Sequence, residues 1–129
     1  MDLMFDSATL TAFIATTDAQ RTTTFYRDVL GLRLVSDEPV ALVFDANGTR
    51  LRIQKIESLA PQPFTVLGWW VSDIRDAVSA LVARGVVFDR YPWAKQDSLG
   101  IWLASSGARV AWFKDPDGNV LSLTQDARA

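Results

Sequence analysis

The sequence contains no cysteine and no histidine. The missing cysteines exclude disulfides, thiol nucleophiles and thiolate metal ligands, and the missing histidines exclude the commonest metal ligand and general base. Acid–base catalysis would depend on Asp, Glu, Lys or Tyr, and a nucleophile would be a hydroxyl, an amine or a carboxylate. These absences weigh against an enzyme, although they leave metal-independent catalysis open.

Strong charge of one sign and long hydrophobic runs are also absent. Thirteen Lys and Arg against fifteen Asp and Glu leave a net charge of −2, with no basic run of the kind that binds nucleic acid. No apolar run reaches the roughly 18 residues that a membrane span needs. Residues 1–10 carry two aspartates and no Lys or Arg, unlike a secretory leader. We therefore expect a cytoplasmic protein with neither a nucleic acid nor a membrane as partner.

What remains is an ordinary globular chain. It has 129 residues, of which 49% are hydrophobic and 22% are charged. At about 150 residues per domain, this length predicts a single domain over residues 1–129.

Two similar segments follow one another along this chain. Alternating apolar stretches at residues 10–16 and 66–71 are each followed by a helix-like stretch, at residues 18–30 and 73–84. Each helix-like stretch begins at an aspartate that can accept first-turn amide hydrogens, and stops at a glycine suited to the left-handed conformation. The aspartates are Asp18 and Asp73, and the glycines are Gly31 and Gly85.

Strand-like runs at residues 32–35 and 86–88 follow the two glycines, and an Asn-Gly or Asp-Gly pair later predicts a hairpin in each half. Each half therefore predicts the order strand, helix, strand, strand, strand, in an internal repeat of about residues 7–56 and 64–126. The second half carries an insertion around residues 91–106, which contains Trp93 and Trp102.

Alternation within the terminal strands predicts two faces. One set is uniformly apolar and should meet the helices; it includes Leu10, Ile14, Leu51 and Leu121. The opposite set mixes polar and aromatic side chains, as the wall of a ligand pocket would. From that set and the insertion, the candidate ligand-binding residues are Thr11, Phe13, Arg52, Gln54, Val66, Trp70, Trp102 and Ser122.

Two motifs resemble a known family. Phe25-Tyr26-Arg27-Asp28-Val29-Leu30-Gly31 closes the first helix-like stretch, and Trp112-Phe113-Lys114-Asp115-Pro116-Asp117-Gly118-Asn119 enters the last hairpin. Together they resemble the vicinal oxygen chelate superfamily, which contains glyoxalases, bleomycin-resistance proteins and extradiol dioxygenases, over essentially the whole chain. The resemblance implies an α+β fold of two βαβββ modules in tandem, forming a curved mixed sheet with a cavity, in a homodimer.

The resemblance also implies where a metal would be bound. Metal-dependent members hold a divalent ion through four inward side chains, and the matching positions here are Thr11, Arg52, Val66 and Ser122. None of these offers an imidazole or a carboxylate, and Arg52 would place a positive charge where the cation belongs. A shift of one residue in the alignment supplies no such donor either. We therefore expect no metal and no other cofactor.

Several candidate residues have two interpretations. An inward Arg52 could bind an anionic ligand, or pair with an acid of the partner chain or lie exposed at the mouth of the cavity, and Gln54 could share either role. Trp70 and Trp102 could contact a ligand, or could belong to the core or a dimer interface. Thr11 and Ser122 are hydroxyls with no visible base to activate them. Structural roles are expected for Tyr26 in packing and for Asp115 and Asp117 in a turn.

The resulting hypothesis is a metal-free superfamily member, similar to bleomycin-resistance proteins, that binds or sequesters a small, flat organic molecule. The molecule would carry a negative charge if Arg52 binds it. Two alternatives stay open at this stage: a metal-independent lyase, isomerase or hydrolase that uses Arg52 and Ser122, and a structural or regulatory dimer whose cavity is filled by Phe13 and Trp70.

Overall fold

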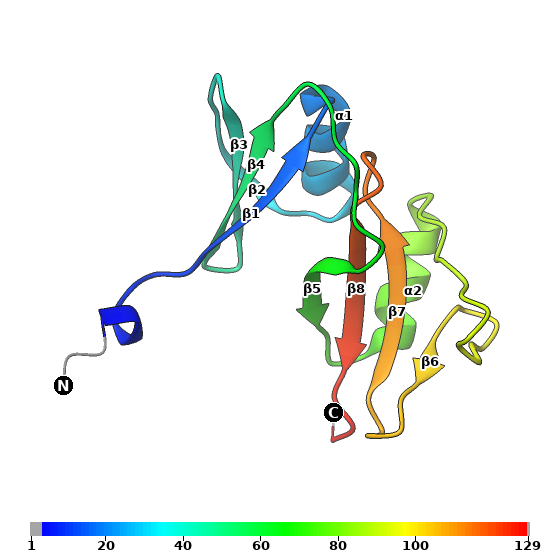
Figure 1. The fold of residues 1–129 in the computed structure, drawn as a ribbon. Helices are drawn as coiled ribbons and strands as arrows, with labels where there is room; N and C mark the ends of the chain where they lie inside the picture. The colour runs from blue at the N-terminus through cyan, green and yellow to red at the C-terminus, as the bar shows by residue number, and fades with distance from the viewer. Residues whose placement is uncertain (1–3, 129) are drawn as a thin grey trace. The chain divides into compact units, whose positions relative to one another are not determined.

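The computed structural model describes residues 4–128 and divides into two compact units, residues 1–59 and 60–129 (Figure 1). Each unit contains a four-stranded mixed sheet and a helical segment between its first two strands. This confirms the predicted α+β class with two tandem modules. A single domain over residues 1–129 stays a prediction.

The first unit has the sheet order β1-β4-β3-β2, in which β1 is parallel to β4 and the other neighbours are antiparallel. A short 3-10 helix precedes the sheet, and helix α1 continues as one π-helical turn, η2. The elements are η1 (Met4–Asp6), β1 (Thr11–Thr16), α1 (Ala19–Thr23), η2 (Thr24–Val29), β2 (Arg33–Asp37), β3 (Ala41–Ala46) and β4 (Thr49–Lys55).

The sequence signals for this helix act as predicted. The Asp18 carboxylate accepts a hydrogen bond from the Arg21 amide at 3.1 Å, and Gly31 follows the helical segment with a φ of +78°. The fully buried ring of Tyr26 lies 5.9 Å from the ring of Phe44 on β3. Tyr26 therefore packs the helical segment on the sheet.

The second unit repeats this arrangement with the order β5-β8-β7-β6, in which β5 is parallel to β8. Asp73 caps its helix by accepting from the Asp76 amide at 3.1 Å, and Gln125 Oε1 accepts from the Ile74 amide at 2.9 Å. The helix therefore begins on the face of the sheet to which Gln125 points. The elements are β5 (Thr65–Trp70), α2 (Ile74–Ala83), β6 (Trp102–Leu103), β7 (Arg109–Lys114) and β8 (Val120–Gln125).

The strand predicted at residues 86–88 is wrong. Val86 and Phe88 are buried in an irregular segment, where the Phe88 ring packs 5.3 Å from that of Phe113. The edge strand beside β7 is instead β6, which lies in the insertion. A long connection leads to it from α2 (Figure 1). Burial of the two apolar side chains, rather than strand pairing, explains the alternating pattern that suggested a strand.

Both predicted hairpin turns are present. Asn47 and Gly48 both have positive φ, 51° and 95°, as a two-residue turn between β3 and β4 requires. In the second turn, Asp115 Oδ1 accepts from the amides of Asp117 and Asn119, each at 3.0 Å. The predicted structural role of Asp115 is therefore confirmed.

The predicted face alternation is largely observed. Ile14, Leu51, Ile53 and Leu121 are buried, whereas Leu10 precedes β1 and is exposed, so its assignment to the helix-facing set was wrong. Within residues 4–128, no helix is long and apolar enough to cross a membrane.

Candidate functional site

The face of the first sheet opposite the helix carries four of the predicted ligand-binding residues. Pairing of β1 with β4 places Phe13 beside Arg52, Thr11 beside Arg50 and Ala15 beside Gln54. Paired residues point to the same face of a sheet, so these side chains share one surface. We call this surface the open face of the first unit. Phe13 is an apolar residue on this face, and it is 57% exposed.

Arg52 has an acidic partner within its own unit. Its Nη1 and Nη2 atoms donate to Glu38 Oε1 at 3.4 and 3.5 Å, and Ser36 Oγ donates to Glu38 Oε2 at 3.0 Å. The Arg52 and Glu38 side chains are 28% and 43% exposed, so this long ion pair stabilises the fold only weakly. The guanidinium thus remains accessible from the open face.

The open face of the second unit is rich in tryptophan. Pairing across β5, β8 and β7 aligns Gly68, Ser122 and Trp112, and the next row contains Trp70 and Trp102. Trp70 is 74% exposed. Trp112, the first residue of the second sequence motif, therefore lies on the same face as the predicted residues Ser122, Trp70 and Trp102.

Val66 does not occupy the position that simple alternation predicted. The register of β5 against β8 shifts between Thr65 and Leu67, so Thr65 pairs with Val120 and Val66 lies at the irregularity. The two residues that follow on the open face, Gly68 and Trp70, keep their predicted orientation. A bulge of this kind leaves no clear signal in the alternation of a short apolar run.

Four aromatic residues pack together on the second open face; we call Tyr91, Trp93, Trp102 and Trp112 the aromatic cluster. Trp93 packs edge-on against Trp102 at 5.2 Å and against Trp112 at 5.6 Å, and its ring stacks on Tyr91 at 5.9 Å. Trp93 itself is largely exposed. The inserted segment thus brings Trp93 and Trp102 onto the sheet, where they form a broad aromatic surface with Trp112.

Gly68 permits the close approach of two strands beneath this surface. A Cβ atom at Gly68 would lie 2.8 Å from Ser122 Oγ and 3.3 Å from the Ser122 carbonyl oxygen. Ser122 is buried, so its hydroxyl has little space into which to move.

Replacing Gly68 with alanine is expected to lower the free energy of unfolding by about 1–2 kcal/mol, because the added methyl group overlaps Ser122. Urea denaturation of the single and double variants measures the effect. In a Ser122→Ala background the cost of Gly68→Ala should fall, since one of the two close atoms is gone. Equal costs in both backgrounds would contradict this contact.

A charged group borders the aromatic cluster. Lys114 Nζ donates to Asp89 Oδ2 at 2.6 Å, and the Tyr91 hydroxyl lies 3.4 Å from the same oxygen. The hydrogen bond to Asp89 raises the pKa of Lys114. Burial raises the pKa of Tyr91, and the negative charge of Asp89 adds to this. Both groups therefore stay protonated near neutral pH, which is unfavourable for a general base.

Asp89→Asn is expected to lower the pKa of both Lys114 and Tyr91 toward their ordinary values of 10.5 and 10.0. Absorbance at 295 nm, as the difference between a protein and its Tyr91→Phe variant, follows the Tyr91 phenol. In the unsubstituted protein the Lys114 contribution to stability is complete below the ordinary pKa and is lost as pH rises through the higher folded-state pKa. A Tyr91 titration unchanged by Asp89→Asn would contradict this coupling.

The donors on these faces do not fit a divalent cation. Thr11, Arg52 and Ser122 provide two hydroxyls and a guanidinium, and Arg52 is paired with the nearby carboxylate of Glu38. In the part of the chain that the structure describes, no three Asp or Glu side chains gather as a metal site would require.

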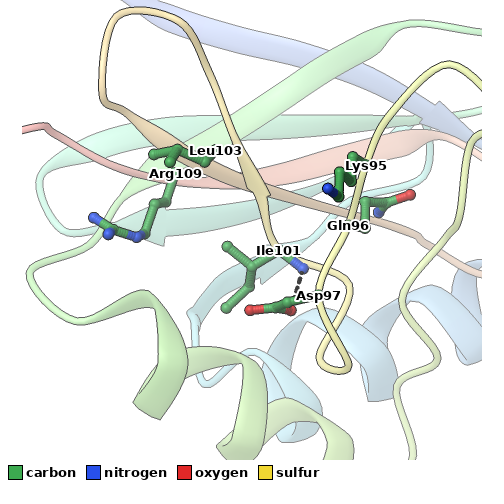
Figure 2. A pocket seen from close by; sticks show the side chains of 6 residues that line it. All are labelled: Lys95, Gln96, Asp97, Ile101, Leu103 and Arg109. Atoms are coloured by element: carbon green, nitrogen blue, oxygen red, sulfur yellow. Dashed lines mark hydrogen bonds between the residues drawn. The ribbon is translucent and has the colours of Figure 1, made fainter.

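The second unit has a separate pocket of about 260 Å³. Figure 2 shows the residues that line it, which are Lys95, Gln96, Asp97, Ile101, Leu103 and Arg109. Leu103 and Arg109, which pair across β6 and β7, line it on the side of the sheet opposite Trp102. Asp97 shapes its wall by accepting from the Ile101 amide at 2.9 Å and pairing with Arg75 at 3.3 Å. Its carboxylate is thus committed to local structure.

Comparison with known families gives a match over most of the chain. The model of the Glyoxalase/Bleomycin resistance protein/Dioxygenase superfamily matches residues 8–123. The chain belongs to this superfamily. The resemblance inferred from the two sequence motifs is thereby confirmed. No curated protein gave a match.

Solved structures of the superfamily share the fold. A bleomycin resistance determinant encoded on the transposon Tn5 is 20% identical, with a TM-score of 0.73 over 93% of this chain and 98% of that chain. The lactoylglutathione lyase from Agrobacterium tumefaciens is 17% identical, with a TM-score of 0.72 over 95% and 96%. A glyoxalase family protein from Enterococcus faecalis is 21% identical, with a TM-score of 0.71 over 94% and 99%. At these identities the likeness concerns the fold, and function depends on the site residues.

Proposed function

We propose that this superfamily member binds a small, flat organic molecule on its open faces, without a metal ion, and acts by sequestering it. The aromatic cluster with the exposed Trp70 is the main support, because planar indole surfaces attract planar ligands by stacking and by burial of apolar area. The Tn5 bleomycin resistance determinant, which has the same fold, is consistent with such a role.

The side chains near these surfaces favour binding over catalysis. Tyr91 and Lys114 have raised pKa values, so neither is tuned to accept a proton near neutral pH. Ser122 has no hydrogen bond from its hydroxyl to a basic side chain within the described residues, so nothing there activates it as a nucleophile. A metal-independent enzyme using Arg52 and Ser122 is therefore the less supported alternative.

The proposal includes a homodimer, as the superfamily resemblance implies. Phe13 and Trp70 are both exposed in the single chain, and each could be covered by a ligand or by a second copy. Sedimentation of the protein with and without ligand separates these cases. A dimer that forms only when Phe13 and Trp70 are intact, and that binds no planar molecule, would favour the structural alternative.

The aromatic surface can be tested with a flat, uncharged compound, 1-naphthalenemethanol, by isothermal titration calorimetry. We expect binding that weakens about three- to tenfold in Trp70→Ala and in Trp102→Ala, because each variant removes one ring from the surface. Phe5→Ala is the control, since Phe5 is an exposed aromatic residue in η1 outside the open faces. Absence of binding, or equal binding by all variants, would overturn the proposal.

A further inference from the structure

We propose that a pocket of about 440 Å³ at one end of the open face of the first unit binds an acidic group, a carboxylate or a phosphate, of a planar ligand that lies on that same face. The pocket lies between β1, β4, β3 and β2 and is lined by Thr9, Thr11, Arg33, Val35, Asp45, Gly48 and Arg50. The inference rests on the proposed function, because it assigns a place to the acidic group of a planar molecule whose ring would cover Phe13, one row along the same open face.

The strand register brings the charged residues together. Thr11 pairs with Arg50, Arg50 pairs with Asp45, and Asp45 pairs with Arg33, so the four side chains form one row across all four strands. Directly opposed side chains in a sheet have Cβ atoms about 5 Å apart. Two guanidinium groups therefore flank a single carboxylate on one surface.

The charges in this row do not balance. Arg33 Nη2 lies 3.6 Å from Asp45 Oδ2, whereas no carboxylate between residues 4 and 128 lies within ion-pair distance of Arg50. The row consequently has one positive charge more than it has acids. A guanidinium offers five N–H donors in a fork that matches two oxygens of a carboxylate or phosphate.

Asp45 is held in place by the neighbouring turn. Its Oδ1 accepts from the Gly48 amide at 3.0 Å, while Oδ2 faces Arg33. The turn has the backbone conformation that a two-residue hairpin needs, with positive φ at both Asn47 and Gly48. Asp45 is thus engaged on both oxygens, and Arg50 is left for a group from outside the chain.

The pocket also offers neutral donors and adequate size. The hydroxyls of Thr9 and Thr11 line it, and neither has a hydrogen-bond partner within the described residues. Its volume lies within the range of about 300–1,000 Å³ typical of small-molecule sites. Excess positive charge, free hydroxyls and space together favour an oxyanion over a neutral or cationic group.

The test compares three compounds with the same ring system: 1-naphthoate, 1-naphthyl phosphate and the uncharged 1-naphthalenemethanol. Binding is followed at constant ionic strength by calorimetry and by amide NMR shifts of Thr9, Thr11 and Gly48. We expect at least one of the two acids to bind more tightly than the alcohol and to shift these three amides. Comparison of the two acids distinguishes a carboxylate from a phosphate.

Two substitutions should act in opposite directions. Arg50→Gln is expected to weaken binding of the acid about tenfold, and binding of the alcohol should not change. Asp45→Asn keeps an acceptor for the Gly48 amide and removes the negative charge, so it should tighten binding of the acid about threefold. Arg21→Gln, on the exposed surface of α1, makes the same change in net charge outside the pocket and should leave binding unaltered.

The outcomes separate this inference from the proposed function. If the alcohol binds and the acids bind no more tightly, or if Arg50→Gln and Arg21→Gln have equal effects, the pocket does not hold an acidic group, and the aromatic site stands. If none of the three compounds binds, both proposals fail. The amide spectra of the variants check the fold: outside the pocket they are expected to match the spectrum of the unsubstituted protein.

Discussion

Trp112→Ala is expected to lower the free energy of unfolding by about 3 kcal/mol. Trp112 contacts the other three members of the aromatic cluster, with ring centres 5.3 Å from Tyr91, 5.6 Å from Trp93 and 5.8 Å from Trp102. Removal of a large, half-buried ring leaves a cavity that the surrounding side chains fill only in part. Urea denaturation followed by circular dichroism measures the loss, and binding of 1-naphthalenemethanol should weaken in parallel.

Trp70→Ala is the matched control for this result. Trp70 lies on the same open face, but it is 74% exposed and has no aromatic contact within residues 4–128. Its replacement should change stability by less than about 0.5 kcal/mol while still weakening binding of the naphthalene compound. Equal losses of stability in the two variants would show that the cluster is not the packed unit described above.

Asp115→Ala is expected to destabilise the fold by about 2–4 kcal/mol. Only 5% of Asp115 is exposed, and its two oxygens accept from the amides of Asp117 and Asn119 and from the Asn119 side chain at 2.9–3.0 Å. Alanine would leave these donors in a buried turn without their acceptor. The midpoint and slope of urea denaturation measure the change.

Asp115→Asn tests which part of this contribution comes from the second oxygen. Its Oδ1 can still accept the two backbone amides, whereas its Nδ2 cannot accept from the Asn119 side chain. Asp115→Asn should therefore lower the free energy of unfolding clearly less than Asp115→Ala does. Asp126→Ala, at an exposed position, should have little effect on stability. A loss for Asp115→Ala as small as that for Asp126→Ala would contradict the role assigned to the turn.

Local signals in the sequence predicted much of the fold. The helix caps Asp18 and Asp73 and the positive-φ residues Gly31 and Gly48 act within a few residues of themselves, so their effect can be read without tertiary information. Their repetition at matching places in the two halves predicted the tandem modules. The two motifs then identified the superfamily.

The errors concern features set by distant residues. Val86 and Phe88 alternate as a strand would, yet they are buried in an irregular segment, and the edge strand is formed instead by Trp102 and Leu103. Val66 lies where the register of β5 against β8 shifts, and β8 is more than 50 residues further along the chain. Periodicity carries no information on such pairing.

The sequence predicted which residues lie on the open faces better than it predicted the contacts between them. Thr11, Phe13, Arg52 and Gln54 share one face as expected, and Trp70, Trp102 and Ser122 share another. The partner of Arg52 was missed, because Glu38 is 14 residues away in a connection between strands and has no sequence signal. The role proposed for Arg50 depends on the strand pairing that places it beside Asp45, and the sequence alone did not indicate this pairing.

Native mass spectrometry of the purified protein with 1-naphthoate tests metal-independent binding, because it reports bound metal and bound organic molecule in one spectrum. We expect a complex with 1-naphthoate, no stoichiometric divalent metal, and the same complex after treatment with EDTA. A metal ion bound at one per chain, or a complex that disappears with EDTA, would contradict metal-independent binding and restore a metal-dependent interpretation of the fold.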